Sequence, residues 1–261
     1  MKKKKLIIAI VEGTSDQYAL DDLLNQLTSD LIDVKFAIVR GDILQQDGVT
    51  NNNILSRIKD HIEQYLNIHK LKRNDILSII HIVDIDGVFL DENKIIHKDD
   101  ADTTYTKDGI VTAYKDKIIL RNKRKRQLLN LLSTKDNIWS GIPYSVYYFS
   151  CNLEWVLYDI TSNLSMDEKN DLAIDFHDKY EEDIQGFLSL IGDPLIAAPG
   201  NYEETWNYIK DVNSRIERKS NLHIFIESII SSTMLKTIGL ILLSAKLTLF
   251  NSIICHFNII L

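Results

Sequence analysis

The sequence has few of the residues that cross-link a chain or interrupt its helices and strands: two cysteines, three prolines and ten glycines among 261 residues. Cys151 and Cys255 make no disulfide framework and no zinc-binding pattern, which fits a reducing compartment. The sequence also has no internal repeat and no proline- or glycine-rich stretch that would indicate a flexible linker. These absences favour one continuous α/β core with an extension over a string of small modules.

Motifs of several common enzyme classes are missing as well. There is no Gly-x-x-x-x-Gly-Lys phosphate-binding loop, so any ATP-driven step would need a partner protein. The seven histidines form neither a His-x-His nor a His-Glu-x-x-His pattern, and there is no Gly-x-Ser-x-Gly nucleophile elbow. The sequence therefore argues against a P-loop ATPase, a zinc protease of the His-Glu-x-x-His type and an α/β-hydrolase.

The charge and the N-terminal residues bear on partners and location. The net charge is −7, so the surface as a whole does not indicate nucleic-acid binding, although a local basic strip would still allow it. After Met-Lys-Lys-Lys-Lys only six apolar residues precede Glu12, which is too short for a signal peptide. We expect a cytoplasmic protein.

The last segment, Thr237 to Leu261, differs in composition from the rest because Lys246 is its only charge. Its 25 residues are about the length that crosses a bilayer. Lys246 near the middle would cost about 2.5–3.5 kcal/mol on insertion. Three interpretations stay open: a buried terminal helix and strand, a membrane tail anchor, or a tail that is not the natural end of the domain.

Short β-branched runs bounded by Gly and Asp predict buried strands of a parallel sheet. Segments with helical spacing separate them, and this β-α-β-α-β order implies right-handed crossovers. We expect strands at 6–11, 34–39, 77–83 and 144–149, with helices at 16–27, 54–66 and 116–133. Further helices are expected at 155–160, 166–173, 184–191 and 202–216. The fold class is thus an α/β, Rossmann-like parallel sheet with a helical C-terminal extension.

The predicted division is a catalytic domain at residues 1–160 and a helical extension with an apolar tail at 161–261. An insertion at about 88–112 interrupts the first part. Its polar stretch from Glu92 to Thr112 is rich in Asp and Thr, and it could fold over the site as a hairpin or lid.

Acidic residues directly follow two of the predicted strands. Glu12 follows the first strand, and Asp84 and Asp86 follow the third. The crevice of an open parallel sheet lies beyond the carboxyl ends of its strands. Residues i and i+2 of a strand face the same side, which predicts Asp84 and Asp86 about 6–7 Å apart. Clustered carboxylates repel one another unless a cation neutralises them, and hard oxygen ligands suit Mg²⁺ or Mn²⁺.

Each acidic residue also has a simpler interpretation. Asp16, or Ser15 before it, is a plausible helix N-cap. Asp84-Ile85-Asp86-Gly87 could be a turn with solvated aspartates. Glu154 follows the strand at 144–149 as Glu12 follows the first, yet a glutamate in the first turn of a helix is favoured by the helix dipole alone.

Two segments, Val11-Glu12-Gly13-Thr14-Ser15-Asp16 and Asp84-Ile85-Asp86-Gly87, resemble the TOPRIM fold of primases, topoisomerases and OLD-type nucleases. Asn152-Leu153-Glu154-Trp155 resembles an element of the OLD-like and RloB-like proteins of bacterial anti-phage systems. The resemblance covers about residues 5–160 and implies a Mg²⁺- or Mn²⁺-dependent nuclease acting on DNA or RNA. It implies catalytic roles for Glu12, Asp84 and Asp86, and metal ligation by Glu12, Asp16, Asp84, Asp86 and Glu154.

The same resemblance implies a role in defence against phage, with an ATPase or sensor protein as a partner. Two other functions fit the residues. The chain could be a non-catalytic regulatory or partner-binding module of the same fold, or it could transfer phosphoryl or nucleotidyl groups to a small nucleotide.

A basic run in the predicted helix at 116–133 is the candidate contact to nucleic acid, because each phosphate neutralised adds salt-dependent affinity. Its members are Lys117, Arg121, Lys123, Arg124, Lys125 and Arg126. The alternative is a solvated helix face or a set of internal ion-pair partners for an acidic chain.

Overall fold

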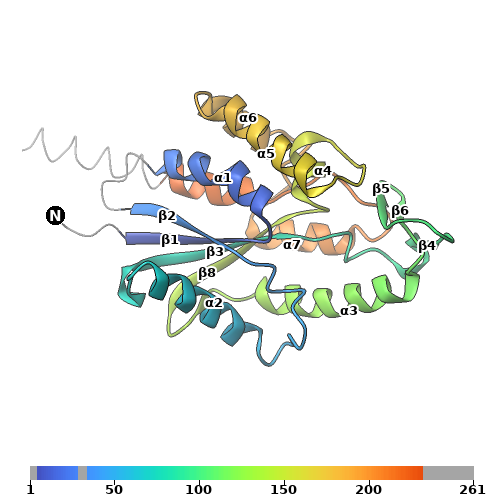
Figure 1. The fold of residues 1–261 in the computed structure, drawn as a ribbon, viewed down its shortest axis with the longest axis horizontal. Coiled ribbons are helices and arrows are strands. Elements are labelled where there is room, and N and C mark those ends of the chain that lie inside the picture. Colours follow the sequence, from blue (N-terminus) through green and yellow to red (C-terminus); the bar gives the residue numbers. More distant parts are fainter. Residues whose placement is uncertain (1–4, 29–33, 232–261) are drawn as a thin grey trace, which may run out of the picture.

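A computed structural model describes residues 5–28 and 34–231 of the chain. Its centre is a five-stranded sheet in the order β2-β1-β3-β8-β7 (Figure 1). Neighbouring strands pair in parallel except the short β7, which runs antiparallel to β8. The strands are β1 (Lys5–Val11), β2 (Val34–Arg40), β3 (Ile76–Asp84), β7 (Asn137–Ile138) and β8 (Ile142–Phe149). The predicted α/β class with a mostly parallel sheet is confirmed for the part of the chain described.

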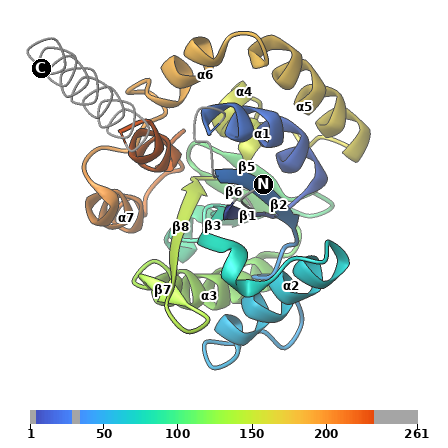
Figure 2. The same cartoon turned by 90° about the vertical axis from the view of Figure 1, so that its left-hand side faces the viewer.

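Helices cover both faces of this sheet (Figure 2). One face carries α1 (Thr14–Leu27), α4 (Leu153–Tyr158), α5 (Met166–Tyr180), α6 (Ile184–Ile191) and helical residues 222–231. The other face carries α2 (Ile54–Ile68) and α3 (Lys115–Leu132), and α7 (Tyr202–Asp211) adds to the same hydrophobic cluster beside β8. Because the sheet is covered on both faces, β1 is buried continuously from Leu6 to Val11 and shows no polar alternation.

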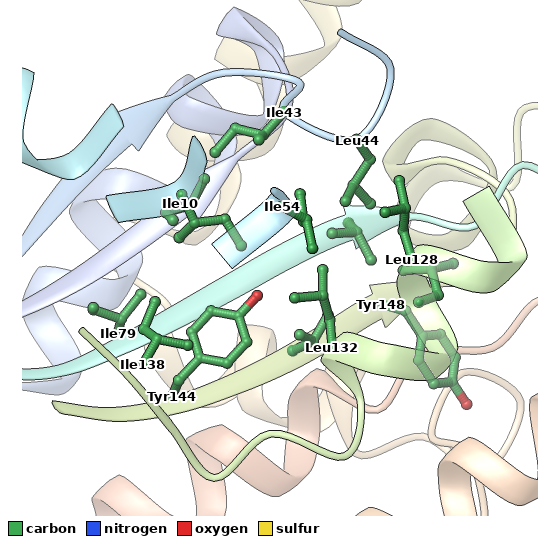
Figure 3. Close-up of a cluster of buried hydrophobic side chains, with 14 of the residues drawn as sticks. Ile10, Ile43, Leu44, Ile54, Ile79, Leu128, Leu132, Ile138, Tyr144 and Tyr148 are labelled. Carbon is green, nitrogen blue, oxygen red and sulfur yellow. The ribbon is translucent and has the colours of Figure 1, made fainter. Parts of the chain in front are cut away.

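The apolar cluster beneath α2 and α3 is built from alternate residues of the strands (Figure 3). Ile10 of β1, Ile79 of β3, Ile54 of α2 and Leu128 of α3 all belong to this cluster. The periodic spacing of apolar residues that predicted α2 is therefore the spacing of its buried face.

The strand order creates a switch point at the centre of the sheet. The chain leaves β1 for β2 on one side and then returns across β1 to β3 on the other side. Right-handed crossovers in opposite directions place α1 and α2 on opposite faces. Ligands of such sheets bind beyond the carboxyl ends of the two strands that flank the switch point, here β1 and β3.

The predicted insertion forms a second, small sheet in the order β4-β6-β5, at the end of the main sheet where β1 and β3 finish (Figure 1). Its elements are η2 (Glu92–Lys94), β4 (Ile95–His97), β5 (Thr104–Thr106) and β6 (Gly109–Thr112), and a further short 3₁₀ turn, η1 (Arg73–Asp75), precedes β3. The expected hairpin is the antiparallel pair β5 and β6.

The C-terminal helices share the core of the sheet, since α5, α6 and residues 222–231 belong to one cluster with α1. The helix predicted at 202–216 was too long, because α7 ends at Asp211. The backbone after α7 bonds to the insertion and does not continue the helix. The Asn213 carbonyl accepts from the Asp91 amide, and the Ile216 amide donates to the Lys107 carbonyl. No helix among residues 5–28 and 34–231 is long and apolar enough to cross a bilayer. The tail at 237–261, for which three interpretations were open, lies outside the described residues.

Candidate active site

A cavity of about 450 Å³ lies at the carboxyl ends of β1 and β3. Four of the five predicted ligands, Glu12, Asp84, Asp86 and Glu154, line it, which brings acidic groups from three separate parts of the chain together. Its other walls come from the small sheet and from the loop between α4 and α5. We call it the acidic cavity.

Glu12 lies at the centre of this group. Its Oε1 accepts a hydrogen bond of 3.2 Å from the backbone amide of Asp84, which ties the end of β1 to the end of β3. Burial raises the pKa of Glu12 to about 8, although the nearby ammonium of Lys125 acts in the opposite direction. The protein thus holds a carboxyl group whose ionised form is unfavourable unless more positive charge arrives.

Asp84 and Asp86 both reach the cavity, but not by strand alternation as predicted. β3 ends at Asp84, and Asp86 has a left-handed backbone conformation with φ 55°. The amide of Asp86 donates to Cys151 and that of Ile85 to Phe149, so the turn is held against the end of β8. Burial, followed by the charge of Glu12, raises the pKa of Asp84 well above its usual value.

Asp16 takes part in the capping of α1, as its simpler interpretation predicted, but it is not the N-cap residue itself. The N-cap of α1 is Gly13, not Ser15 or Asp16, and Asp16 Oδ2 accepts from the Gly13 amide at 2.7 Å. Its side chain is not part of the cavity wall, yet burial and the charge of Glu154 raise its pKa to about 6. Asp16 therefore belongs to the same electrostatic group.

Glu154 is the second residue of α4, whose N-cap is Asn152. The side chain of Asn152 accepts from the Trp155 amide at 2.9 Å. Glu154 is only 3% exposed. Lys169 of α5 places Nζ 3.0 Å from Oε1 and forms an ion pair with it. The C-terminal extension thus supplies a cation to the acidic cavity.

Lys125 is a site residue whose place the sequence reasoning missed. It is 1% exposed, with Nζ 2.8 Å from Asp86 Oδ2 and 3.5 Å from Glu12 Oε1. These carboxylates hold its pKa above the ordinary value despite the cost of burial. A signal was present, because Lys125 falls on the inward face of α3 with Ile118 and Leu132.

The rest of the basic run also makes internal contacts. Arg121 donates to the backbone carbonyl of Asp86 and to the Tyr105 hydroxyl. Arg124 and Arg126 donate to carbonyls in the loops after β2 and β3. The internal-partner interpretation therefore describes Lys125 and these three arginines better than the nucleic-acid interpretation.

Two lysines of the run remain mostly exposed. Lys123 is paired with Glu92 at 3.0 Å, and Lys117 lies 4.9 Å from the centre of the Tyr114 ring. Nucleic-acid contact by these two stays a prediction.

The donors of the acidic cavity suit a hard divalent cation. Burial raises the pKa of Glu12, Asp16 and Asp84, and two ammonium groups, Lys125 and Lys169, face five carboxylates. The carboxylate oxygens are not drawn tightly together, so a Mg²⁺ ion would keep several waters, as it commonly does. The residues that would hold it are Glu12, Asp84, Asp86 and Glu154.

A different group has the tightest arrangement of metal-ligand atoms among the described residues. His177 and Asp178 of α5 and Glu181, the residue that caps its C-terminus, each offer one atom within 4.8 Å of the others. The two acids are exposed, and His177 already pairs with Asp22 of α1 at 2.8 Å. The simplest interpretation of this group is a surface contact between α5 and α1.

Comparison with known proteins identifies no relative. No family model, no curated protein and no solved structure matches the chain.

Proposed function

We propose that the protein is a TOPRIM-like nuclease that hydrolyses phosphodiester bonds with the help of Mg²⁺ or Mn²⁺. The observation that carries the proposal is the meeting of Glu12, Asp84 and Glu154 at one cavity beside the switch point of a parallel sheet. The TOPRIM-like assignment is supported by the order of the acidic motifs, which follow β1, β3 and β8 in turn.

Each side chain has a role in this proposal. Glu12, Asp84, Asp86 and Glu154 would hold the cation, and Lys125 keeps Glu12 and Asp86 in place. A bound divalent ion would activate a water molecule and stabilise the leaving oxygen of the phosphodiester. Glu12, with a pKa near 8 without such an ion, would ionise fully as the ion binds.

A second candidate is a non-catalytic module of the same fold. It is favoured by one observation: Lys125 and Lys169 already place ammonium groups beside Asp86 and Glu154. An acidic cavity neutralised in this way would serve as a docking site for a partner and would need no metal.

The defence role and the ATPase or sensor partner rest on the resemblance alone. The missing phosphate-binding loop supports the need for such a partner in any ATP-driven step.

Cleavage assays separate the two candidates. Single- and double-stranded DNA, tRNA and rRNA are incubated with the full chain and Mg²⁺ or Mn²⁺, and mononucleotides serve to detect group transfer. We expect Glu12→Gln and Asp84→Asn to lower the rate by at least about 100-fold, in line with the removal of a metal-site or charge-stabilising group. Glu63→Gln, an exposed change on α2, should leave the rate unchanged. A wild-type protein that cleaves none of these substrates, alone or with the product of a neighbouring gene, would end the enzyme claim.

A further inference from the structure

A second recess, of about 550 Å³, is rich in positive charge. Lys107 lies in the turn between β5 and β6, and Arg215, Arg218 and Lys219 belong to the segment that follows α7. We call it the basic recess. Only two acidic residues, Asp159 and Glu217, are among its lining residues, in a chain whose net charge is −7.

Two of these cations are held by neutral groups, which position a charge without cancelling it. Lys219 Nζ donates to the carbonyls of Pro194 and Ala197. Arg218 donates to the carbonyls of Val156 and Leu157, and its ion pair with Asp159 is loose at 3.7 Å. The recess therefore keeps an excess of positive charge.

The other two cations face solvent. Arg215 pairs with Glu217, yet 64% of its side chain is exposed, and Lys107 is exposed as well. The backbone amide of Ile216 donates to the carbonyl of Lys107 at 2.8 Å, which holds the hairpin and the segment after α7 together. The two exposed cations thus project from two segments whose backbones are joined by a hydrogen bond.

The basic recess and the acidic cavity share two walls. Asp159 lines the basic recess, and the next residue, Ile160, lines the acidic cavity. Tyr105 of the same hairpin lines the acidic cavity, and Lys107 lines the basic recess. Because consecutive residues are only about 3.8 Å apart between Cα atoms, the two hollows border the same short segment at Asp159 and Ile160 and the same hairpin at Tyr105 and Lys107.

We propose that the basic recess binds the sugar-phosphate backbone of a single-stranded nucleic acid whose neighbouring phosphate enters the acidic cavity. This rests on the proposed nuclease function and names its substrate class. A flexible single strand can follow a positively charged recess, whereas a rigid duplex presents its phosphates on a broad convex surface. Exposed Leu195, on the wall of the recess, offers apolar surface to a base.

Binding is measured by fluorescence anisotropy with the full chain in EDTA, so that no metal-dependent cleavage takes place. The probes are labelled single-stranded DNA and RNA of about 20 nucleotides and a duplex of the same sequence, long enough to span such a site. The test variants are Lys107→Glu and Arg215→Glu. Lys59→Glu on α2 carries the same charge change away from the recess and is the matched control.

We expect each test variant to weaken single-strand binding by at least about tenfold and the control by less than about threefold. The slope of log K against log salt should become shallower by about 0.7 for each phosphate that is no longer neutralised. Unchanged binding in both test variants, an equal loss in Lys59→Glu, or tighter binding of the duplex would overturn the proposal. If the recess binds single strands as expected but the protein cleaves no substrate, the nuclease function alone is refuted. If the protein cleaves nucleic acid but neither Lys107→Glu nor Arg215→Glu weakens binding, the proposed role of the basic recess alone is refuted.

Discussion

Lys125 of α3 lies 2.8 Å from a carboxylate oxygen of Asp86, 39 residues earlier in the chain, and both side chains are largely shielded from water. This ion pair connects the helix that carries the basic run to the turn that ends β3. Moving an ammonium group and a carboxylate out of water is costly, and only close pairing offsets that cost. The pair therefore explains why α3 turns one lysine inward, and it makes the stability of the fold depend on the charge of the acidic cavity.

Replacing Lys125 with methionine should leave Glu12 and Asp86 without their nearest cation. We expect Lys125→Met to lower the free energy of unfolding by about 3–5 kcal/mol, the usual effect of breaking one half of a buried pair. Urea denaturation monitored by circular dichroism measures it. Lys123→Met, which breaks an exposed pair with Glu92, should cost less than about 1 kcal/mol. Equal costs in the two variants would contradict the role given to Lys125.

Added Mg²⁺ should stabilise the protein through the acidic cavity. A ligand that binds only the folded state at 100 times its Kd adds about 2.7 kcal/mol. We expect MgCl₂ to raise the Tm of the wild type and of His177→Ala, and to leave the Tm of Asp84→Asn unchanged. Differential scanning fluorimetry with EDTA as reference provides the measurement. A shift that disappears in His177→Ala instead would place the ion on α5, at the group formed by His177, Asp178 and Glu181.

Gly87 closes the turn after Asp86 with a φ of 62°. A Cβ atom there would lie 2.9 Å from Ile216 Cδ1 and 3.1 Å from Leu90 Cδ1. Gly48 has a similar φ of 72°, but a Cβ atom at that residue would meet nothing within 4 Å, so it isolates the backbone contribution. We expect Gly48→Ala to cost about 1–2 kcal/mol and Gly87→Ala to cost more, as measured by chemical denaturation. A smaller loss for Gly87→Ala would show that Ile216 moves aside freely.

The contact between α5 and α1 should depend on pH. Hydrogen bonds to Asp178 and Asp22 raise the pKa of His177 above its ordinary value of 6.5. The stabilisation is therefore fully present below about pH 6.5 and is lost as the pH rises through the higher pKa of the folded state. Because Asp22 is exposed, we expect the effect to be about 0.2–1 kcal/mol. The Tm difference between wild type and Asp22→Asn should be larger at about pH 6 than at about pH 9; a difference that grows with pH would reverse the assignment.

Much of the architecture follows from neighbours along the chain. The apolar run from Leu6 to Val11 and the spacing of Ile54, Ile58 and Ile62 predicted a buried strand and an amphipathic helix at the observed places. The strand-end positions of Glu12 and Asp84 predicted a shared cavity, because parallel strands bring their carboxyl ends to one edge. These features depend on local periodicity and on the handedness of crossovers.

The remaining features of the site depend on contacts between distant segments. Asp86 reaches the cavity from a left-handed turn held by Cys151, and Lys125 and Lys169 approach it from helices on opposite faces. The basic recess joins a hairpin of the insertion to a segment about one hundred residues later. Only the tertiary structure decided these features. Sequence patterns indicate which residues lie on one face of a single helix or strand, whereas these contacts join residues that are far apart in the chain.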